Sequence, residues 1–240
     1  TITKEEFKEK MIASAELPKT AQPSIGRFVE VYDELGKNGD SVISIQMMRS
    51  ISGTVDAARQ AADITETNVT VVDSDFTSRS MGMIVKEAAK AAQDGKTVEE
   101  ILEIIEDAKK RTTLYLTVVN LDNLIKGGRI SQLMGMFSNL LNIKLFLQVI
   151  NGKIEIIQKG RGLKSLQKKY DEIFEQMKSA PKGIQEIGIM HAGLSDFNEG
   201  NIARVRELFP DVPLTIVTTS PIIMSHTGVD AMAITYLENK

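Results

Sequence analysis

The sequence predicts a two-domain α/β protein, with a parallel-sheet α/β domain at residues 1–111 and an α+β domain with a mixed or antiparallel sheet at residues 112–240. Before residue 111, strand-length apolar runs alternate with helical patterns, which is typical of a parallel sheet covered on both faces. Beyond it, strand-length runs follow one another closely. The 240 residues suffice for two domains. Small ligands usually bind in clefts between domains, so we expect a ligand there.

Two helices are predicted ahead of the first strand. Thr3 and Glu6 fit a capping box, in which the threonine hydroxyl binds a backbone N–H and the carboxylate returns the bond. Residues 18–24 hold two prolines and are expected to be extended, because residues before proline avoid the helical region. Apolar residues then recur at helical spacing until Gly36 ends the run; they are Phe28, Val31, Tyr32 and Leu35.

Two strand–loop–helix units follow. The expected strands are Val42–Met48 and Val69–Val72, and the expected helices run from Ser52-Gly53-Thr54 to about Ile64 and over residues 78–93. A second capping box, at Thr97 and Glu100, begins a further helix that ends near Arg111.

The strands beyond Arg111 are joined by a recognisable turn. Asn151-Gly152 lies between two apolar runs and is a strong hairpin signal, because both central residues of a type I′ turn need positive φ. Helices are expected near residues 163–178 and 198–208. The expected strands are Leu114–Val119, Lys144–Ile150, Ile154–Gln158, Glu186–Met190, Leu214–Thr218 and Ala231–Tyr236.

Composition excludes several kinds of site. The chain has no cysteine, so disulfides, thiolate nucleophiles and zinc–thiolate centres are excluded, which fits a reducing cytoplasmic compartment. Two histidines, His191 and His226, are too few for a His-rich metal site.

No apolar run is long enough to span a bilayer. The net charge of −3 does not indicate nucleic-acid binding, although residues 1–110 are acidic and residues 111–240 slightly basic.

Ser52-Gly53-Thr54 lies where a strand ends and a helix begins. Free backbone N–H groups and the positive end of the helix dipole meet at such a place, so an anion is the natural ligand. The alternative is that Ser52 simply caps the helix, since serine is a favoured N-cap residue.

Two basic residues are further candidates for binding an anion. Lys126-Gly127-Gly128-Arg129 ends a short amphipathic stretch, and paired glycines would hold Arg129 in place, where its guanidinium matches a carboxylate or phosphate. An exposed arginine after a helix cap is the alternative. For His226, in Ser225-His226-Thr227-Gly228, the sequence alone favours a structural histidine bonded to a neighbouring backbone group over a ligand-binding one.

Asp73-Ser74-Asp75-Phe76-Thr77 follows an apolar strand and matches the DxDxT signature of haloacid-dehalogenase-like phosphotransferases. In those enzymes the first aspartate is the nucleophile and Mg²⁺ bridges the carboxylates. The downstream acidic pair of that class is missing here. A Mg²⁺-dependent phosphohydrolase using Asp73 and Asp75 is therefore the alternative hypothesis, of lower rank.

Seven segments occur in one order that resembles the DegV family across nearly the whole chain. They are Thr20-Ala21-Gln22-Pro23-Ser24, Ser52-Gly53-Thr54, Val71-Val72-Asp73-Ser74, residues 121–131 with the ending Lys-Gly-Gly-Arg-Ile-Ser, Leu140-Leu141-Asn142-Ile143-Lys144, Arg161-Gly162 and His226-Thr227-Gly228. The resemblance implies a bacterial lipid-binding protein that holds a long-chain fatty acid in a tunnel between its domains. It also implies a partner fatty acid kinase that makes acyl phosphate for phospholipid metabolism. It implies no catalysis by this chain, no cofactor, no metal and no nucleic acid, and it leaves transient membrane contact open.

The resemblance also assigns residues. Thr20 and Ser52, the latter with Gly53 and Thr54, resemble the groups that bind the fatty-acid carboxylate, and Arg129 and His226 resemble the basic residues of the same site. Asp73 then becomes a structural residue at the end of a strand. The departures from the family pattern are Ala21 for serine, Leu145 for proline, and residues 229–232 for a Gly-rich stretch. The family also begins earlier, with an additional strand, so we expect this chain to lack its first strands.

The acyl tail would supply most of the affinity. Burying about 14 methylenes at about 0.8 kcal/mol each gives about 11 kcal/mol before ordering costs. An apolar helix beside Arg129 and the start of the helix at residue 78 are candidate tunnel walls, with ordinary core packing as the alternative. The candidates are Leu133, Met134, Met136, Phe137, Leu140 and Leu141, together with Met81 and Met83.

Overall fold

The computed structural model describes residues 2–129 and 143–240, and these residues form two compact units. The larger unit comprises Thr1–Thr20, Thr113–Gln148 and Glu155–Lys240, and the smaller unit comprises Ala21–Thr112 and Val149–Ile154. The first twenty residues therefore belong with the second half of the chain, although the sequence pattern groups them with residues 1–111.

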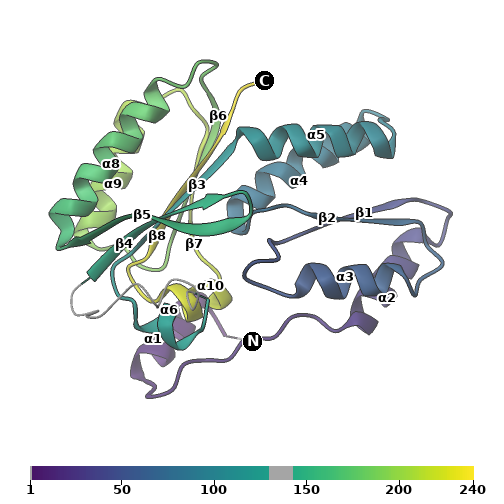
Figure 1. The fold of residues 1–240 in the computed structure, drawn as a ribbon, viewed down its shortest axis with the longest axis horizontal. Helices are drawn as coiled ribbons and strands as arrows, with labels where there is room; N and C mark the ends of the chain where they lie inside the picture. The colour runs from purple at the N-terminus through teal and green to yellow at the C-terminus, as the bar shows by residue number, and fades with distance from the viewer. Residues whose placement is uncertain (1, 130–142) are drawn as a thin grey trace. The chain divides into compact units, whose positions relative to one another are not determined.

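A six-stranded mixed sheet forms the larger unit, with strand order β5-β4-β3-β8-β6-β7 (Figure 1). The strands β3 and β4 pair antiparallel, as do β6 and β8, whereas β6 and β7 are parallel. The smaller unit holds a parallel two-stranded sheet of β1 and β2. The predicted fold class is thus confirmed. The strands are β1 Val42–Gln46, β2 Val69–Asp73, β3 Thr112–Val118, β4 Ile143–Ile150, β5 Lys153–Arg161, β6 Ile184–His191, β7 Leu214–Thr218 and β8 Met232–Glu238.

Helices α8 (Leu163–Lys178) and α9 (Asp196–Leu208) bury one face of the six-stranded sheet. Leu166, Tyr170 and Phe174 recur along α8 at helical spacing and are fully buried. They meet residues of alternate positions on the strands, such as Ile187 and Ile189 of β6. Each such buried apolar side chain contributes about 1.5–3 kcal/mol relative to exposure, so this layer is the main hydrophobic core of the unit.

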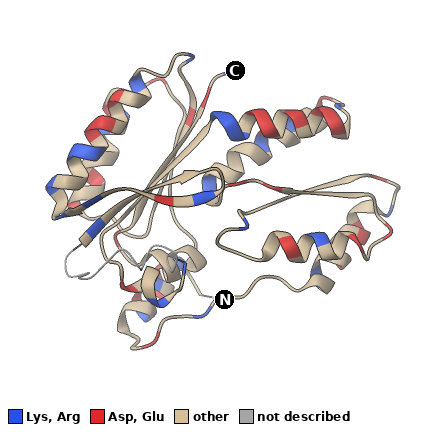
Figure 2. Ribbon diagram, viewed as in Figure 1, with Lys and Arg blue, Asp and Glu red and all other residues tan. Residues whose placement is uncertain are grey.

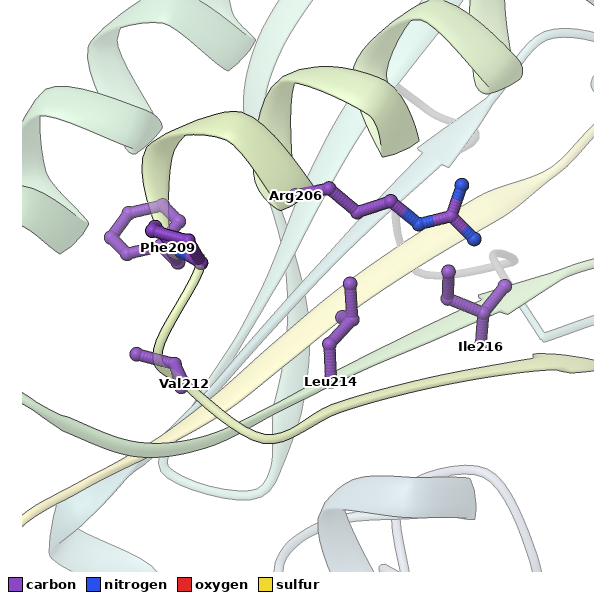
Figure 3. Close-up of a pocket in the computed structure, with 6 residues that line it drawn as sticks. Arg206, Phe209, Val212, Leu214 and Ile216 are labelled. Carbon is purple, nitrogen blue, oxygen red and sulfur yellow. The ribbon is translucent and has the colours of Figure 1, made fainter.

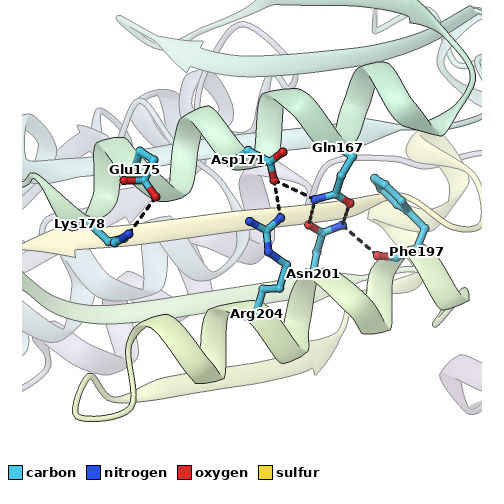
Figure 4. A network of polar contacts seen from close by, with 7 residues as sticks. All are labelled: Gln167, Asp171, Glu175, Lys178, Phe197, Asn201 and Arg204. Atoms are coloured by element: carbon cyan, nitrogen blue, oxygen red, sulfur yellow. Dashed lines mark hydrogen bonds and ion pairs between the residues drawn. The ribbon is translucent and has the colours of Figure 1, made fainter.

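Polar side chains join α8 to α9 along the outer edge of their contact (Figure 4). Gln167 donates to the Asn201 Oδ1 at 3.1 Å, and the Asn201 amide donates back to the Gln167 Oε1 at 3.3 Å and to the Phe197 carbonyl at 2.9 Å. Arg204 pairs with Asp171, which lies one turn along from Gln167. Asn201 is only 1% exposed, so its amide hydrogen bonds offset the cost of burying it.

Three short helices lie at one end of the six-stranded sheet (Figure 1): α1 (Lys4–Ala13), α6 (Asp122–Lys126) and α10 (Pro221–Thr227). A small apolar cluster joins α1 and α10 to the strand ends; its buried members are Met11, Ala192, Met224 and Ala231. The Lys4 ammonium donates to the Thr218 carbonyl at 2.6 Å, at the end of β7. These contacts attach residues 1–20 to the larger unit.

The smaller unit contains α2 (Ile25–Gly36), α3 (Thr54–Ala62), α4 (Ser78–Gln93) and α5 (Val98–Arg111) beside its sheet. The Tyr32 hydroxyl and the Ser44 Oγ form a buried hydrogen bond of 2.7 Å between α2 and β1. Burial raises the pKa of Tyr32 above its ordinary value of 10.0, so this hydroxyl stays protonated.

Local signals in the sequence fix most element boundaries. Both predicted capping boxes form, at Thr3 with Glu6 and at Thr97 with Glu100. The first strand ends at Gln46 rather than Met48, because its last pair is with Asp73, where β2 ends. Helix α10 was not predicted from the sequence, although Ser220 accepts a cap bond from the Ile223 N–H and Pro221 stands at the first helical position.

Charged residues of both signs occur along the helices (Figure 2). Many pair one turn apart, as in Lys96 with Glu100 and Lys178 with Glu175, and such exposed pairs contribute little to stability. Within residues 2–129 and 143–240, no helix has the length and apolarity that crossing a bilayer requires.

We predict that Asn201→Ala lowers the free energy of unfolding by about 1–3 kcal/mol, because it removes three hydrogen bonds and leaves buried partners unsatisfied. Urea denaturation measures this loss. Lys178→Ala, on the same helical layer but in an exposed ion pair, is the control and should change stability by less than about 0.5 kcal/mol. Equal effects of the two substitutions would contradict this role of the amide pair.

Candidate functional site

Two predicted site residues, Thr20 and His226, meet in the larger unit although they are 206 residues apart in the chain. The Thr20 Oγ1 lies 3.0 Å from the Nε2 of His226, within hydrogen-bond distance. His226 is carried by α10, which follows β7 and ends at Thr227; the C-cap residue Gly228 has a φ of 75°. That positive φ lets the chain turn directly after the helix.

Gly127 lies directly against the His226 ring. A Cβ placed on Gly127 would come 2.6 Å from the Nδ1 of His226, so only glycine fits at this close approach. Gly127 stands at the end of α6, and its N–H donates to the Asn123 carbonyl at 2.8 Å. The first of the paired glycines thus makes room for the imidazole, whereas Gly128, with φ of 71°, turns the chain.

Arg129 follows this turn and folds back on it. Its Nη1 donates to the Gly127 carbonyl at 2.7 Å, and the side chain is otherwise exposed. The guanidinium is therefore tethered beside His226 and keeps further N–H donors for an anion. Thr20, His226 and Arg129 place a hydroxyl, an imidazole and a guanidinium in one cluster, which we call the basic cluster.

The electrostatics of the basic cluster favour a neutral histidine. Burial lowers the pKa of His226 below its ordinary value of 6.5, and the positive charge of Arg129 lowers this pKa further. Its Nδ1 is buried with no hydrogen-bond partner among the described residues. An anion bound near this ring would reverse the effect of Arg129, because opposite charge favours the protonated imidazole.

Ser52, Gly53 and Thr54 lie in the smaller unit, at the start of α3. Gly53, not Ser52, is the N-cap residue, so the expectation that Ser52 caps the helix is wrong. The Ser52 Oγ lies 2.7 Å from the Thr54 Oγ1 and accepts from the Thr54 N–H at 3.3 Å. The two hydroxyls therefore form a pair beside the helix N-terminus, where N–H groups and the dipole favour an anion.

Gln22 is a further residue near this hydroxyl pair, and it was not singled out from the sequence. A Cβ on Gly53 would collide with the Gln22 side-chain oxygen, so the amide lies directly over the glycine. Gln22 belongs to the segment Thr20-Ala21-Gln22-Pro23-Ser24. Because it precedes Pro23, the sequence indicates that its backbone is extended, and this was the only signal that pointed to Gln22.

The acidic pair of the alternative hypothesis is occupied by structural contacts. Asp73 accepts the Asp75 N–H at 3.0 Å and the Arg49 N–H at 3.2 Å. The Asp75 carboxylate pairs with Lys109 at 2.7 Å. In the described ranges no group of three acidic or histidine side chains is arranged to hold a metal ion. Asp73 acts here as the acceptor that shapes the turn after β2.

The larger unit also carries a hollow of about 600 Å³ at the edge strand β7 and the end of α9 (Figure 3). Leu214 and Ile216 form its floor, and Arg206 is its one charged lining residue. None of the predicted site residues lines it. A carboxylate bound there would have one guanidinium and no lining hydroxyl, which makes it a poorer head-group site than the basic cluster.

The two groups of predicted residues are therefore each compact: Thr20, Arg129 and His226 in the larger unit, and Ser52, Gly53 and Thr54 in the smaller unit. Their binding roles stay predictions. Of the predicted tunnel residues, Met83 is fully buried in α4. The remaining apolar run, Leu133, Met134, Met136, Phe137, Leu140 and Leu141, lies outside the described residues.

We predict that Asp73→Asn lowers the free energy of unfolding by about 1–3 kcal/mol. The carboxylate accepts two backbone N–H groups, those of Arg49 and Asp75, whereas the asparagine NH₂ group is a donor and would face one of them unpaired. Wild type and variant should release the same background phosphate from p-nitrophenyl phosphate with Mg²⁺. Phosphatase activity that disappears in the variant would restore the alternative hypothesis.

Comparisons of the sequence and of the fold with known proteins point to one family. The sequence model of the DegV family of uncharacterised proteins matches residues 1–239. A DegV domain-containing protein of Streptococcus pneumoniae is 41% identical over 228 residues, which are 95% of this chain and 81% of the relative. A fatty-acid-binding DegV family protein of Streptococcus agalactiae has a similar structure, with a TM-score of 0.89, 27% identity and coverage of 100% of this chain and 85% of that one. The Fatty Acid Kinase (Fak) B3 protein of Streptococcus pneumoniae, loaded with linoleic acid, superimposes with a TM-score of 0.81, 25% identity and coverage of 100% and 85%.

Proposed function

The chain belongs to the DegV family, and from this premise we propose that it binds one long-chain fatty acid and presents it to a separate fatty acid kinase. The observation that carries the proposal is the basic cluster, in which Thr20 and His226 lie within hydrogen-bond distance and Arg129 is tethered beside them. A hydroxyl, an imidazole and a guanidinium are groups that hold a carboxylate.

The head group would have donors available from both units in this proposal. The basic cluster supplies charge, and the hydroxyl pair of Ser52 and Thr54 supplies neutral donors at a helix N-terminus. The acyl chain would run in a tunnel between the units. Burial of its methylenes would supply most of the affinity, and the polar groups would set the register of the carboxylate.

A fatty acid kinase is the proposed partner because one of the similar structures is named a fatty acid kinase protein. The Fatty Acid Kinase (Fak) B3 protein is loaded with linoleic acid in its crystal structure. In our proposal this chain likewise binds and orients the carboxylate, and the partner supplies the phosphoryl donor and transfers the phosphoryl group to it. Native mass spectrometry of the purified protein tests the ligand, since an added mass equal to a fatty acid is expected.

We predict that Ser52→Ala weakens binding of the fatty acid by about 1–3 kcal/mol, roughly one to two decades in Kd, and weakens binding of its methyl ester less. A carboxylate that loses a donor is left underpaired, whereas an ester requires fewer donors. Titration of both ligands measures the difference. Thr97→Ala, which removes a helix-capping hydroxyl elsewhere in the same unit, is the control and should show no preference between acid and ester.

Arg129→Ala should show the same selectivity for the acid if the guanidinium faces the head group. If it faces the kinase instead, binding stays near wild type while acyl-phosphate formation falls. Arg206→Ala, at the hollow beside β7, is the matched arginine control and should change neither quantity. If neither Ser52→Ala nor Arg129→Ala distinguishes acid from ester, the proposed head-group site is wrong.

We also predict that fatty-acid binding takes up a proton at His226. In the free protein the pKa of His226 is held below 6.5 by burial and by Arg129, and a bound carboxylate would raise it. Affinity should therefore rise as the pH falls from the His226 pKa of the ligand-bound protein to the His226 pKa of the free protein. Above both pKa values, affinity should not depend on pH. Calorimetry in buffers of different ionisation enthalpy measures the uptake. His226→Asn should abolish it, the methyl ester should show little, and proton release on binding would contradict the assignment.

A further inference from the structure

Asn123 lies in α6 and forms hydrogen bonds with two segments of the basic cluster. One is α10, which carries His226, and the other is the turn that carries Arg129. The Asn123 Nδ2 donates to the Ser225 carbonyl at 3.1 Å and lies 3.8 Å from the Sδ of Met11 in α1. Its own carbonyl accepts the Gly127 N–H at 2.8 Å. A Cβ placed on Gly228 would lie 3.3 Å from its Oδ1. Asn123 therefore links α1, α6 and α10 through one side chain and one carbonyl.

The hydrogen bond from Asn123 satisfies the Ser225 carbonyl near the C-terminal end of α10. The last carbonyls of a helix have no partner within it, and α10 has only seven residues. The Gly228 N–H takes the Met224 carbonyl, and the Asn123 amide takes the next one, that of Ser225. Ser225 immediately precedes His226, so this bond holds the turn from which the imidazole projects.

The contact with Gly127 holds the other side of the ring. Gly127 lies against the His226 Nδ1, and its carbonyl binds the Arg129 guanidinium at 2.7 Å. Because Asn123 accepts the Gly127 N–H, it also fixes the wall against which the ring lies. Displacing α6 from α10 would change both the burial of His226 and the distance to Arg129.

We propose that Asn123 is a positioning residue that orients His226 and Arg129 for the ligand carboxylate. This inference rests on the proposed function for its effect on binding, but the orientation of His226 is a property of the free protein. Asn123 acts through the α6–α10 contact and does not touch the ligand. The contact with Met11 extends the same network to α1, which leads to Thr20.

The test is Asn123→Leu, which keeps the side-chain size and removes the amide. In the ligand-free protein, the pKa of His226, followed by NMR of its ring protons, should rise toward 6.5, because the ring becomes more solvated and less constrained beside Arg129. Affinity for a long-chain fatty acid such as palmitate should fall about tenfold, and affinity for its methyl ester should fall less.

Asn120→Leu is the matched control. The Asn120 Oδ1 accepts the Asp122 N–H at 2.9 Å at the start of the same helix, and among the described residues the Asn120 side chain makes no hydrogen bond to α10. It should leave both the His226 pKa and the preference for acid over ester unchanged. An equal response of the two variants would mean that any loosening of α6 suffices and would overturn the specific role of Asn123.

Asn123→Ser provides a second variant if the leucine protein does not fold, since serine is polar but too short to reach the Ser225 carbonyl. An unchanged His226 pKa in either folded variant overturns the proposal. Failure of the wild-type protein to bind palmitate would instead overturn the proposed function, while the NMR measurement would still decide the role of Asn123.

Discussion

The buried face between the six-stranded sheet and helices α8 and α9 determines where the functional groups of the larger unit lie. Tyr170 and Phe174 of α8 pack against strand residues such as Ile187 and Ile189, and this layer fixes the register of the strands. Once the register is fixed, the points at which the chain leaves β3 and β7 are fixed as well. Helices α6 and α10 follow those strands and contact each other. Arg129 and His226 are therefore neighbours as a result of core packing far from either residue.

Burial and charge act on the basic cluster in the same direction. A half-buried imidazole beside a guanidinium stays neutral at pH 7, so the free site holds one fixed positive charge and two neutral hydrogen-bonding groups. A carboxylate would be attracted by the guanidinium and would stabilise a second positive charge on the histidine. Such a site would adjust its protonation when an anion binds.

The acidic motif after β2 shows why a short signature is weak support for function. Asp73 and Asp75 match a phosphotransferase pattern by spacing, yet their carboxylates accept backbone N–H groups and pair with Lys109. The turn needs an acceptor at Asp73, and Asp75 adopts a positive φ of 58°, which aspartate tolerates better than most residues. The same residue types therefore serve turn geometry.

The sequence by itself determined the local structure. Capping boxes at Thr3 and Thr97 and the Asn151-Gly152 turn depend on residues only a few positions apart, so propensity and hydrogen-bonding chemistry suffice to predict them. The ordered motifs also indicated the family, and with it the candidate residues. Helix α10 was missed because seven residues make too short a periodic pattern, and a helix this short is stabilised mainly by tertiary packing. Only the tertiary structure placed Thr20 against His226 and Asn123 between α1 and α10, because contacts between residues a hundred or more positions apart arise from packing and leave no local pattern in the chain.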